Sequence, residues 1–284
     1  MSNVLQVSDA GHVRTLRLNR PEKKNALSNE LAWGIIAAVE EAAIDDNVWV
    51  IGITGTNDAF CSGLDLTPAR DPTAARDGQD PDLTPARIGQ GNAPMSSQDA
   101  LLDDLGWVSR FPLVLREQCD KPIVAGLNGV AVGAGLSLAM AADVRIAAES
   151  VRLIAGYPRI GGSPDGGLSW TLPQAIGYEQ AMRFLLENRT VGAEEALRLG
   201  FVGEVVPDDR FQERFEEYCQ SLTNISPITA RLTKRVVRRS TALADAEGHF
   251  RYELANIRMA FTTEDGQEAR QAFGEKRPPV FKGH

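Results

Sequence analysis

The sequence predicts an α/β fold for this chain of 284 residues, on two observations. Continuous apolar runs of strand length, VWVIGIT at 48–54 and PIVAGLN at 122–128, are typical of strands buried on both faces of a sheet. Stretches whose apolar residues recur at helical spacing alternate with them, first at 31–43 and again from 136. This alternation indicates βαβ units. The length suits one large α/β domain or two smaller ones.

The other expected elements follow in chain order. Two strands at 4–7 and 13–18 form a hairpin, joined by the polar five-residue loop 8–12. Ser28 is the expected N-cap of the first helix, and a later helix is expected from Ser97 to about Glu117. Further strands are expected at 144–147 and 202–206, and further helices at 180–188, 193–199, 208–222, 227–240 and 245–261. The late helical part is interpreted as a subdomain or an oligomerisation surface.

Composition and charge exclude several classes of partner. The net charge of −8 argues against a nucleic-acid-binding protein. No stretch reaches the roughly 18 apolar residues of a membrane span, and the N-terminus does not resemble a signal peptide. The three cysteines are widely spaced and form no CxxC pair, which fits a reducing compartment. We therefore expect a cytoplasmic protein with no nucleic-acid or membrane partner.

A glycine-rich stretch, NGVAVGAGLSLAMAADVRIA at 128–147, is the most unusual part of the chain. It places Gly129, Gly133 and Gly135 at the entrance to a helix, although glycine inside a helix costs about 1 kcal/mol relative to alanine. The free N–H groups of a helix N-terminus favour an anion or a developing negative charge. Tight packing of the helix on the sheet is the alternative reading of these glycines.

A second glycine-containing turn, AFCSGLDL at 59–66, also follows an apolar strand. If the two turns converge, one backbone N–H from each would form an oxyanion hole, worth about 3–4 kcal/mol per donor.

Other kinds of catalytic site find no support in the sequence. His12, His249 and His284 stand far apart, outside any metal-ligand pattern. There is no GxSxG elbow, no Walker motif and no GxGxxG fingerprint. The sequence therefore predicts no metal, no bound cofactor and no covalent nucleophile.

Five segments, in order, resemble the crotonase (enoyl-CoA hydratase/isomerase) family. They are RPEKKNAL (20–27), AFCSGLDL (59–66), the stretch 121–147, TVGAEEALRLGFVGEVVP (190–207) and FGEKRPPVFKG (273–283). The resemblance implies a ββα spiral core over 1–207 and a helical C-terminal oligomerisation region over 208–284. It also implies an acyl-CoA thioester substrate, whose coenzyme A enters with the substrate, and a homotrimer or hexamer.

The same resemblance implies the positions of the site residues. The oxyanion-hole donors would be the N–H groups of Leu64 and Ala134. Residues implied in coenzyme A binding are Lys24 (or Lys23) at the phosphates, Ala26, Ser62 and Leu66 at the adenine, and Lys282 with Phe281, which would complete a neighbouring subunit's site.

The chain departs from the hydratases of this family at their two catalytic glutamates. The matching positions hold Ser137 and Tyr157. Hydroxyl groups with pKa values near 10 or above are poor general bases at neutral pH. Ordinary hydratase activity is therefore doubtful on sequence grounds.

A single carboxylate is offered instead by Asp165, in SPDGG. The segment resembles the place where isomerases of the family carry one acidic residue, and one carboxylate suffices to move a proton from C2 to C4. A turn or capping role for this Asp-Gly is the alternative reading. The sequence thus favours an enoyl-CoA isomerase with Asp165 as proton shuttle.

Two other functions stay open. One is a hydratase or lyase that draws its carboxylate from Asp99, Asp103, Asp104 or Glu117, and the other is a CoA-binding scaffold without turnover. The polar segment 67–97 is interpreted as a lid, a binding loop or disorder. Four side chains are candidates either for the acyl pocket or for the core: Trp107, Phe111, Leu168 and Trp170.

Overall fold

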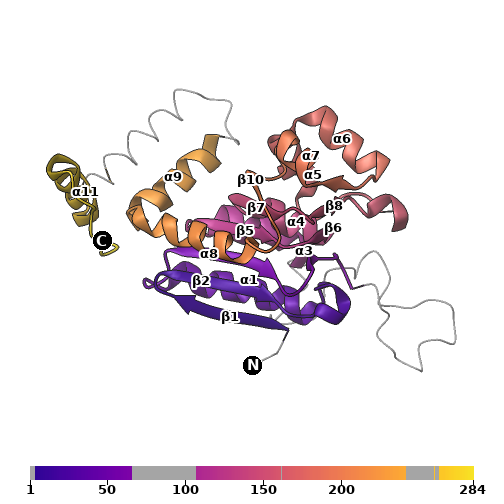
Figure 1. Ribbon diagram of the computed structural model, residues 1–284, viewed down its shortest axis with the longest axis horizontal. Coiled ribbons are helices and arrows are strands. Elements are labelled where there is room, and N and C mark those ends of the chain that lie inside the picture. The colour runs from indigo at the N-terminus through magenta and orange to yellow at the C-terminus, as the bar shows by residue number, and fades with distance from the viewer. Residues whose placement is uncertain (1–3, 66–106, 161, 241–258, 260–261) are drawn as a thin grey trace, which may run out of the picture.

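The computed structural model describes residues 4–65, 107–160, 162–240, 259 and 262–284. Its strands form two sheets (Figure 1). The large sheet has the spatial order β1 (Leu5–Ala10), β2 (Val13–Leu18), β3 (Val50–Gly55), β5 (Ile123–Leu127), β7 (Val144–Ala148) and β10 (Glu204–Val206). The small sheet has the order β4 (Ala59–Cys61), β6 (Val130–Val132), β8 (Arg152–Ile154) and β9 (Val191–Gly192). Only the outer pairs β1–β2 and β8–β9 are antiparallel among these paired strands.

The helices lie around these sheets. In chain order they are η1 (Pro21–Lys23), α1 (Asn29–Ile44), α3 (Trp107–Pro112), the π-helical η4 (Leu113–Gln118), α4 (Ala134–Ala141), η5 (Tyr157–Ile160), α5 (Leu168–Ile176), α6 (Tyr178–Glu187), α7 (Ala193–Leu199), α8 (Phe211–Ser221), η6 (Leu222–Asn224), α9 (Pro227–Ser240) and α11 (Glu264–Glu275). Within the described part of the chain, no helix has the length and apolar character needed to cross a membrane.

The chain winds through the two sheets in repeated ββα turns. Each turn adds one strand to the large sheet, one to the small sheet and then a helix: β3–β4–α3, β5–β6–α4 and β7–β8–α5. The strands of successive turns pair in parallel in both sheets. This arrangement confirms the expected α/β class and the ββα spiral. It also stacks the connections that follow β4 and β6, because these two strands are neighbours.

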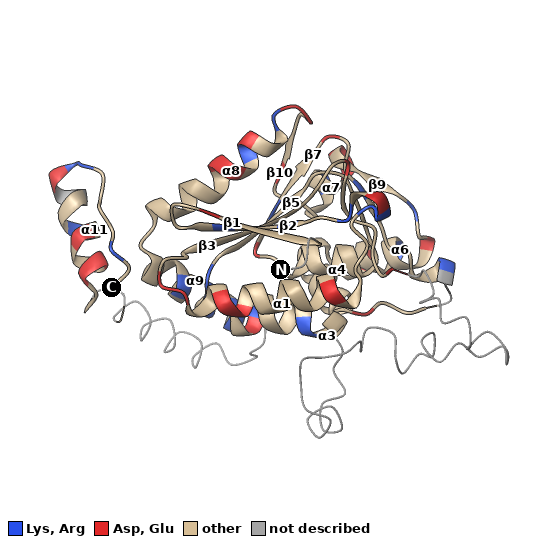
Figure 2. Ribbon diagram, turned by 90° about the horizontal axis from the view of Figure 1, so that it is seen from below, with Lys and Arg blue, Asp and Glu red and all other residues tan. Residues whose placement is uncertain are grey.

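The apolar runs are buried as expected. Every residue of β3 and β5 is buried, and these strands carry no charged residue, so Figure 2 shows both in tan. Ser28 caps α1 by accepting a hydrogen bond from the Leu31 N–H at 3.2 Å. Helix α8 covers one face of the large sheet, where Phe215 packs in a second apolar cluster with Val50 and Val124.

The hairpin is present, but the predicted length of its loop is wrong. Antiparallel pairing runs from Leu5 opposite Leu18 to Ala10 opposite Val13, so only Gly11 and His12 connect β1 and β2. The polar residues of 8–10 are exposed on an edge strand, and their polarity resembled that of a loop. Gly11 adopts φ +57, which suits a two-residue turn.

The helix expected from Ser97 to Glu117 is described only from Trp107, and it changes type at Pro112. Proline lacks the N–H of a regular helical turn, which accounts for the wider π-helical η4. The segment 67–97, the first part of that helix and nearly all of the helix expected at 245–261 lie outside the described residues. Helix α11 and the short strands of the small sheet were not predicted.

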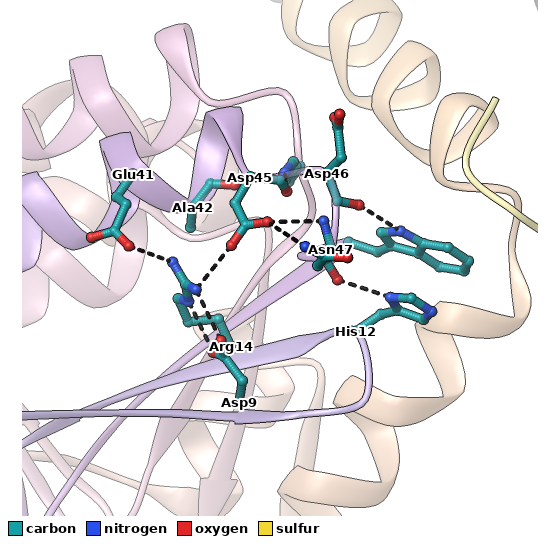
Figure 3. A network of polar contacts seen from close by, with 10 residues as sticks. Asp9, His12, Arg14, Glu41, Ala42, Asp45, Asp46 and Asn47 are labelled. Atoms are coloured by element: carbon teal, nitrogen blue, oxygen red, sulfur yellow. Dashed lines mark hydrogen bonds and ion pairs between the residues drawn. The ribbon is translucent and has the colours of Figure 1, made fainter.

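An ionic network ties the hairpin to the end of α1 (Figure 3). The Arg14 guanidinium donates twice to Asp9 at 2.9 Å and also reaches Asp45 at 3.1 Å and Glu41 at 3.4 Å. The hydrogen bond from Arg14 is the largest influence on Asp9 and holds the pKa of that carboxyl below its usual value. The network therefore stabilises the packing of β1 and β2 on α1.

Candidate active site

The two glycine turns found in the sequence meet at the end of the small sheet. A Cβ atom on Gly135 would lie 2.4 Å from the Cys61 carbonyl oxygen. A Cβ on Gly63 would lie 2.7 Å from the Val132 carbonyl oxygen and 3.8 Å from the Ala134 nitrogen. Since real Cβ atoms do not approach backbone oxygen this closely, glycine is required by the contact between the turns. Both readings of these glycines, tight packing and a site for close approach, are thus compatible with the structure.

Each turn presents a backbone N–H without a protein acceptor in the described part of the chain. Leu27 uses both of its backbone groups on the residues flanking Leu64, donating to Gly63 at 2.8 Å and accepting from Asp65 at 3.0 Å. The Leu64 N–H therefore points away from Leu27. Ala134 is the first residue of α4, where an N–H has no carbonyl from a preceding turn. Two such donors on contacting turns suit a developing oxyanion.

Three of the residues implied in coenzyme A binding lie together beside this position. The Ser62 N–H donates to the Lys24 carbonyl at 2.9 Å, and the Ser62 hydroxyl donates to the Lys23 carbonyl at 3.0 Å. Ala26 is buried next to them, its N–H donating to the Lys23 carbonyl. The Lys24 amine pairs with Asp58, and both side chains are mostly exposed. Leu66 lies outside the described residues.

Lys282 lies elsewhere in the chain, on the tail after α11. Its N–H donates to the buried Asp265 carboxylate at 2.7 Å, and the Gly283 N–H donates to the same group at 2.9 Å. Figure 1 shows α11 at the left edge of the molecule, away from α3 and β6. A contact of Lys282 with a neighbouring subunit's site stays a prediction.

Asp165 is held by the two residues that stand at the glutamate positions of the hydratases. The Tyr157 hydroxyl donates to Asp165 Oδ1 at 3.0 Å. Ser137 Oγ lies 3.2 Å from the Tyr157 hydroxyl, from the Asp165 carbonyl oxygen and from the Gly133 carbonyl oxygen. Ser137 is one turn into α4, Tyr157 begins η5 and Asp165 lies in the turn before α5, so three separate segments supply this cluster.

The cluster is buried on the side of the hydroxyls and open on the side of the carboxylate. Ser137 is fully buried and Tyr157 is 6% exposed, whereas Asp165 is exposed to water. A Cβ on Gly166 would lie 2.9 Å from the Ser137 Cβ, so this glycine lets the Asp165 turn approach α4 closely. The position of Asp165 is therefore fixed by contact with the helix that begins at Ala134.

The surroundings of Asp165 raise the pKa of its carboxyl. Partial burial is the main cause, and the hydrogen bond from Tyr157 opposes it. Burial, followed by the charge of Asp165, raises the pKa of the Tyr157 hydroxyl. Tyr157 thus remains a protonated donor at neutral pH, and Asp165 is the group of this cluster able to exchange a proton.

The other candidate residues do not join this cluster. Glu117 faces Arg238 of α9, 3.6 Å from its guanidinium, and Asp99, Asp103 and Asp104 lie outside the described residues. Three of the candidate acyl-pocket side chains are completely buried core residues: Trp107, Phe111 and Leu168. Trp170 is 39% exposed and lies under the Arg116 guanidinium.

Sequence reasoning noticed Ser137 and Tyr157 only as positions where carboxylates are missing. It did not anticipate that the two hydroxyls would bond to each other and to Asp165. One signal was available: both residues match the catalytic glutamates of the hydratases. Those glutamates must lie near each other because they act on one substrate.

Comparison with known proteins identifies the family. The model of the enoyl-CoA hydratase/isomerase family matches residues 9–82 and 108–284. The chain belongs to this family. It is 31% identical to the 1,2-epoxyphenylacetyl-CoA isomerase of Escherichia coli, with 95% of each protein covered. It is also 32% identical to the 2,3-dehydroadipyl-CoA hydratase of the same organism, with 98% of each covered.

Solved structures agree with the fold. The crystal structure of an enoyl-CoA hydratase from Bacillus anthracis superposes with a TM-score of 0.81 at 28% identity, over 99% of this chain and 100% of that one. The protein is therefore a crotonase-fold enzyme of acyl-CoA chemistry. Since an isomerase and a hydratase are equally similar to it, the choice of reaction depends on the site.

Proposed function

We propose that the protein is an enoyl-CoA isomerase, which moves a carbon–carbon double bond of an acyl-CoA through a thioester enolate. The observation that carries the proposal is the single carboxylate of the described cluster, Asp165, bonded to Tyr157 where a hydratase has a second acid.

The chemistry needs two functions from the protein. The N–H groups of Leu64 and Ala134 bind the thioester oxygen and stabilise the negative charge that develops there. Asp165 removes a proton from C2 of a 3-enoyl-CoA, which gives a dienolate, and returns that proton to C4. The product is a 2-enoyl-CoA, and the carboxylate ends ionised as it began.

The electrostatics of Asp165 suit this exchange. A carboxyl group whose pKa is raised by partial burial holds the abstracted proton more readily than an ordinary aspartate. Hydration would need an activated water as well, and the buried hydroxyls of Ser137 and Tyr157 are poor bases for that task.

Coenzyme A binding is proposed at the paired segments that contain Lys24, Ala26 and Ser62, together with Leu66. Lys282 is proposed to reach this site from a neighbouring subunit of a homotrimer or hexamer. Light scattering of the purified protein measures the assembly, and Lys282→Ala measures the contribution of that side chain to KM.

Incubation with a short 3-enoyl-CoA and separately with the 2-enoyl-CoA tests the reaction. We expect the conjugated 2-enoyl thioester from the first substrate and little addition of water to the second, as followed by ultraviolet absorbance and mass spectrometry. Asp165→Asn should lower kcat by about 10²–10⁴-fold, the usual contribution of a proton-transferring group. Asp9→Asn, far from the site in the Arg14 network, is the matched control and should keep its kcat.

Two results would reject the proposal. Full isomerase activity in Asp165→Asn would remove the carboxylate from the mechanism. A 3-hydroxyacyl-CoA as the main product would instead favour a hydratase, and binding of acyl-CoA without turnover would favour a scaffold.

A further inference from the structure

We infer that Tyr157 is a positioning residue. Its hydroxyl, which contacts Ser137, donates a hydrogen bond to Oδ1 of Asp165 and leaves Oδ2 as the oxygen that carries the substrate proton. This inference rests on the proposed isomerase function and adds a role for a side chain that has no carboxylate chemistry of its own.

Tyr157 is fixed without help from Asp165. Its ring is 6% exposed and belongs to the main apolar core. Its carbonyl oxygen accepts from the Gly162 N–H at 3.0 Å, and the preceding Gly156 N–H donates to the Asn188 side chain at 2.7 Å. The phenol therefore projects toward Asp165 from a rigid turn.

The protons of the cluster can be assigned from the number of donors. Tyr157 has one proton, and its closest carboxylate acceptor is Asp165 Oδ1 at 3.0 Å, against 3.5 Å to the Asp165 carbonyl oxygen. With that proton committed, the phenol oxygen can only accept in its 3.2 Å contact with Ser137 Oγ, and the single Ser137 proton also has the Gly133 and Asp165 carbonyl oxygens at 3.2 Å. A chain of hydroxyls then ends on one oxygen of the carboxylate.

The other oxygen, Oδ2, accepts no side-chain hydrogen bond among the described residues. The described elements that contact the Asp165 turn present neutral groups to it: Ser137 from α4, Tyr157 from η5 and Val108 from α3. The influences on the pKa of Asp165 are burial and the hydrogen bonds from Tyr157 and the backbone, with no neighbouring charge among them. One oxygen is thus anchored and the other is available to substrate.

Loss of the phenol should change the pH dependence of the reaction in a known direction. A hydrogen bond donated to the ionised carboxylate stabilises that form, so its removal raises the pKa of Asp165 further. Proton abstraction requires the ionised form, which exists above the pKa. The acid limb of kcat/KM against pH therefore moves to higher pH when the hydroxyl is removed.

The decisive variant is Tyr157→Phe, which keeps the buried ring and deletes only the hydroxyl. We expect kcat to fall by about 10–100-fold with KM changed by less than about twofold, because orientation of a catalytic group acts on the chemical step. The acid limb should rise by about one pH unit, as expected for a charge-assisted hydrogen bond. Tyr218→Phe on α8 is the control and should leave both unchanged.

A second replacement, 3-fluorotyrosine at position 157, preserves size and makes the phenol a stronger donor. It should move the acid limb to lower pH, opposite to the effect of Tyr157→Phe, and it guards against a folding defect in that variant. An acid limb that moves in neither variant, or in the same direction in both, would overturn the role of Tyr157.

Asp165→Asn separates failure of this inference from failure of the proposed function. If Asp165→Asn is inactive while Tyr157→Phe behaves as the unmodified protein, the isomerase proposal survives and the positioning role is wrong. If Asp165→Asn is fully active, the proposed function itself is wrong. In the double variant the second change should add almost nothing, because both act on one carboxylate.

Discussion

Two aspartates of this protein, Asp9 and Asp165, each accept a side-chain hydrogen bond of nearly the same length, yet their pKa values move in opposite directions. Asp9 accepts from the Arg14 guanidinium at 2.9 Å, and the pKa of its carboxyl is lowered. Asp165 accepts from the Tyr157 hydroxyl at 3.0 Å, and the pKa of its carboxyl is raised. The charge of the donor and the degree of burial make the difference.

This contrast distinguishes a structural carboxylate from one suited to proton transfer. Arg14 is 7% exposed and pairs with three carboxylates, and its positive charge favours the ionised form of Asp9. Asp165 has only neutral hydroxyls beside it, and its negative charge is uncompensated within the described cluster. Such a charge costs stability, and it is retained where a reaction uses it.

The largest effect, a loss of kcat, is expected from separating the two glycine turns of 59–66 and 128–147. In Gly135→Ala the new Cβ would meet the Cys61 carbonyl oxygen at 2.4 Å and its sulfur at 2.7 Å, so the backbone must shift. Misplacing an oxyanion donor should lower kcat by about 10²-fold or more, measured with a 3-enoyl-CoA below the melting temperature of the variant. Gly192→Ala, where the new Cβ meets nothing within 4 Å, should be neutral. Unchanged activity in Gly135→Ala would contradict the assignment of the donors.

A smaller effect, on stability alone, is expected in the ionic network. Arg14→Met leaves Asp9, Asp45 and Glu41 without their shared cation and should lower the free energy of unfolding by about 1–3 kcal/mol. Urea denaturation measures this loss, while kcat should not change. Arg183→Met, which breaks two exposed pairs on α6 with Glu179 and Glu187, should cost less than about 1 kcal/mol. A loss of kcat in Arg14→Met would mean that the network also supports the site.

The smallest effect is expected on stability, which Asp9→Asn and Asp165→Asn should change in opposite directions. Because the folded-state pKa of Asp9 is lowered, its stabilising contribution is present above its unfolded value of 3.8 and is lost as the pH falls through the folded value. The folded-state pKa of Asp165 is raised, so its ionised form destabilises the fold above that pKa and is neutral below 3.8.

Melting temperatures measured from pH 3 to pH 8 test this difference. At neutral pH Asp9→Asn should be less stable than the unmodified protein and Asp165→Asn slightly more stable, each by less than about 1 kcal/mol. Both differences should shrink toward pH 3. Equal shifts of the same sign in the two variants would remove the distinction between the aspartates.

The sequence by itself determined the elements whose signal is local. Apolar runs predicted β3 and β5, helical spacing and Ser28 predicted α1, and the glycines of 59–66 and 128–147 marked the two turns that meet. Asp165 was found because one acidic residue stands in a family motif that otherwise lacks its acids. The family was recognisable for the same reason, since its motifs are short contiguous segments.

Only the tertiary structure decided what surrounds Asp165. Ser137, Tyr157 and Asp165 lie up to 28 positions apart and come from α4, η5 and the turn before α5, so no periodicity within one segment brings their oxygens to about 3 Å. The same limit applies to the hairpin, where strand pairing overrode the polarity of 8–10, and to Trp107, whose burial follows from packing. Local sequence sets backbone preference, whereas the burial and hydrogen bonds that tune a carboxylate depend on contacts between distant segments.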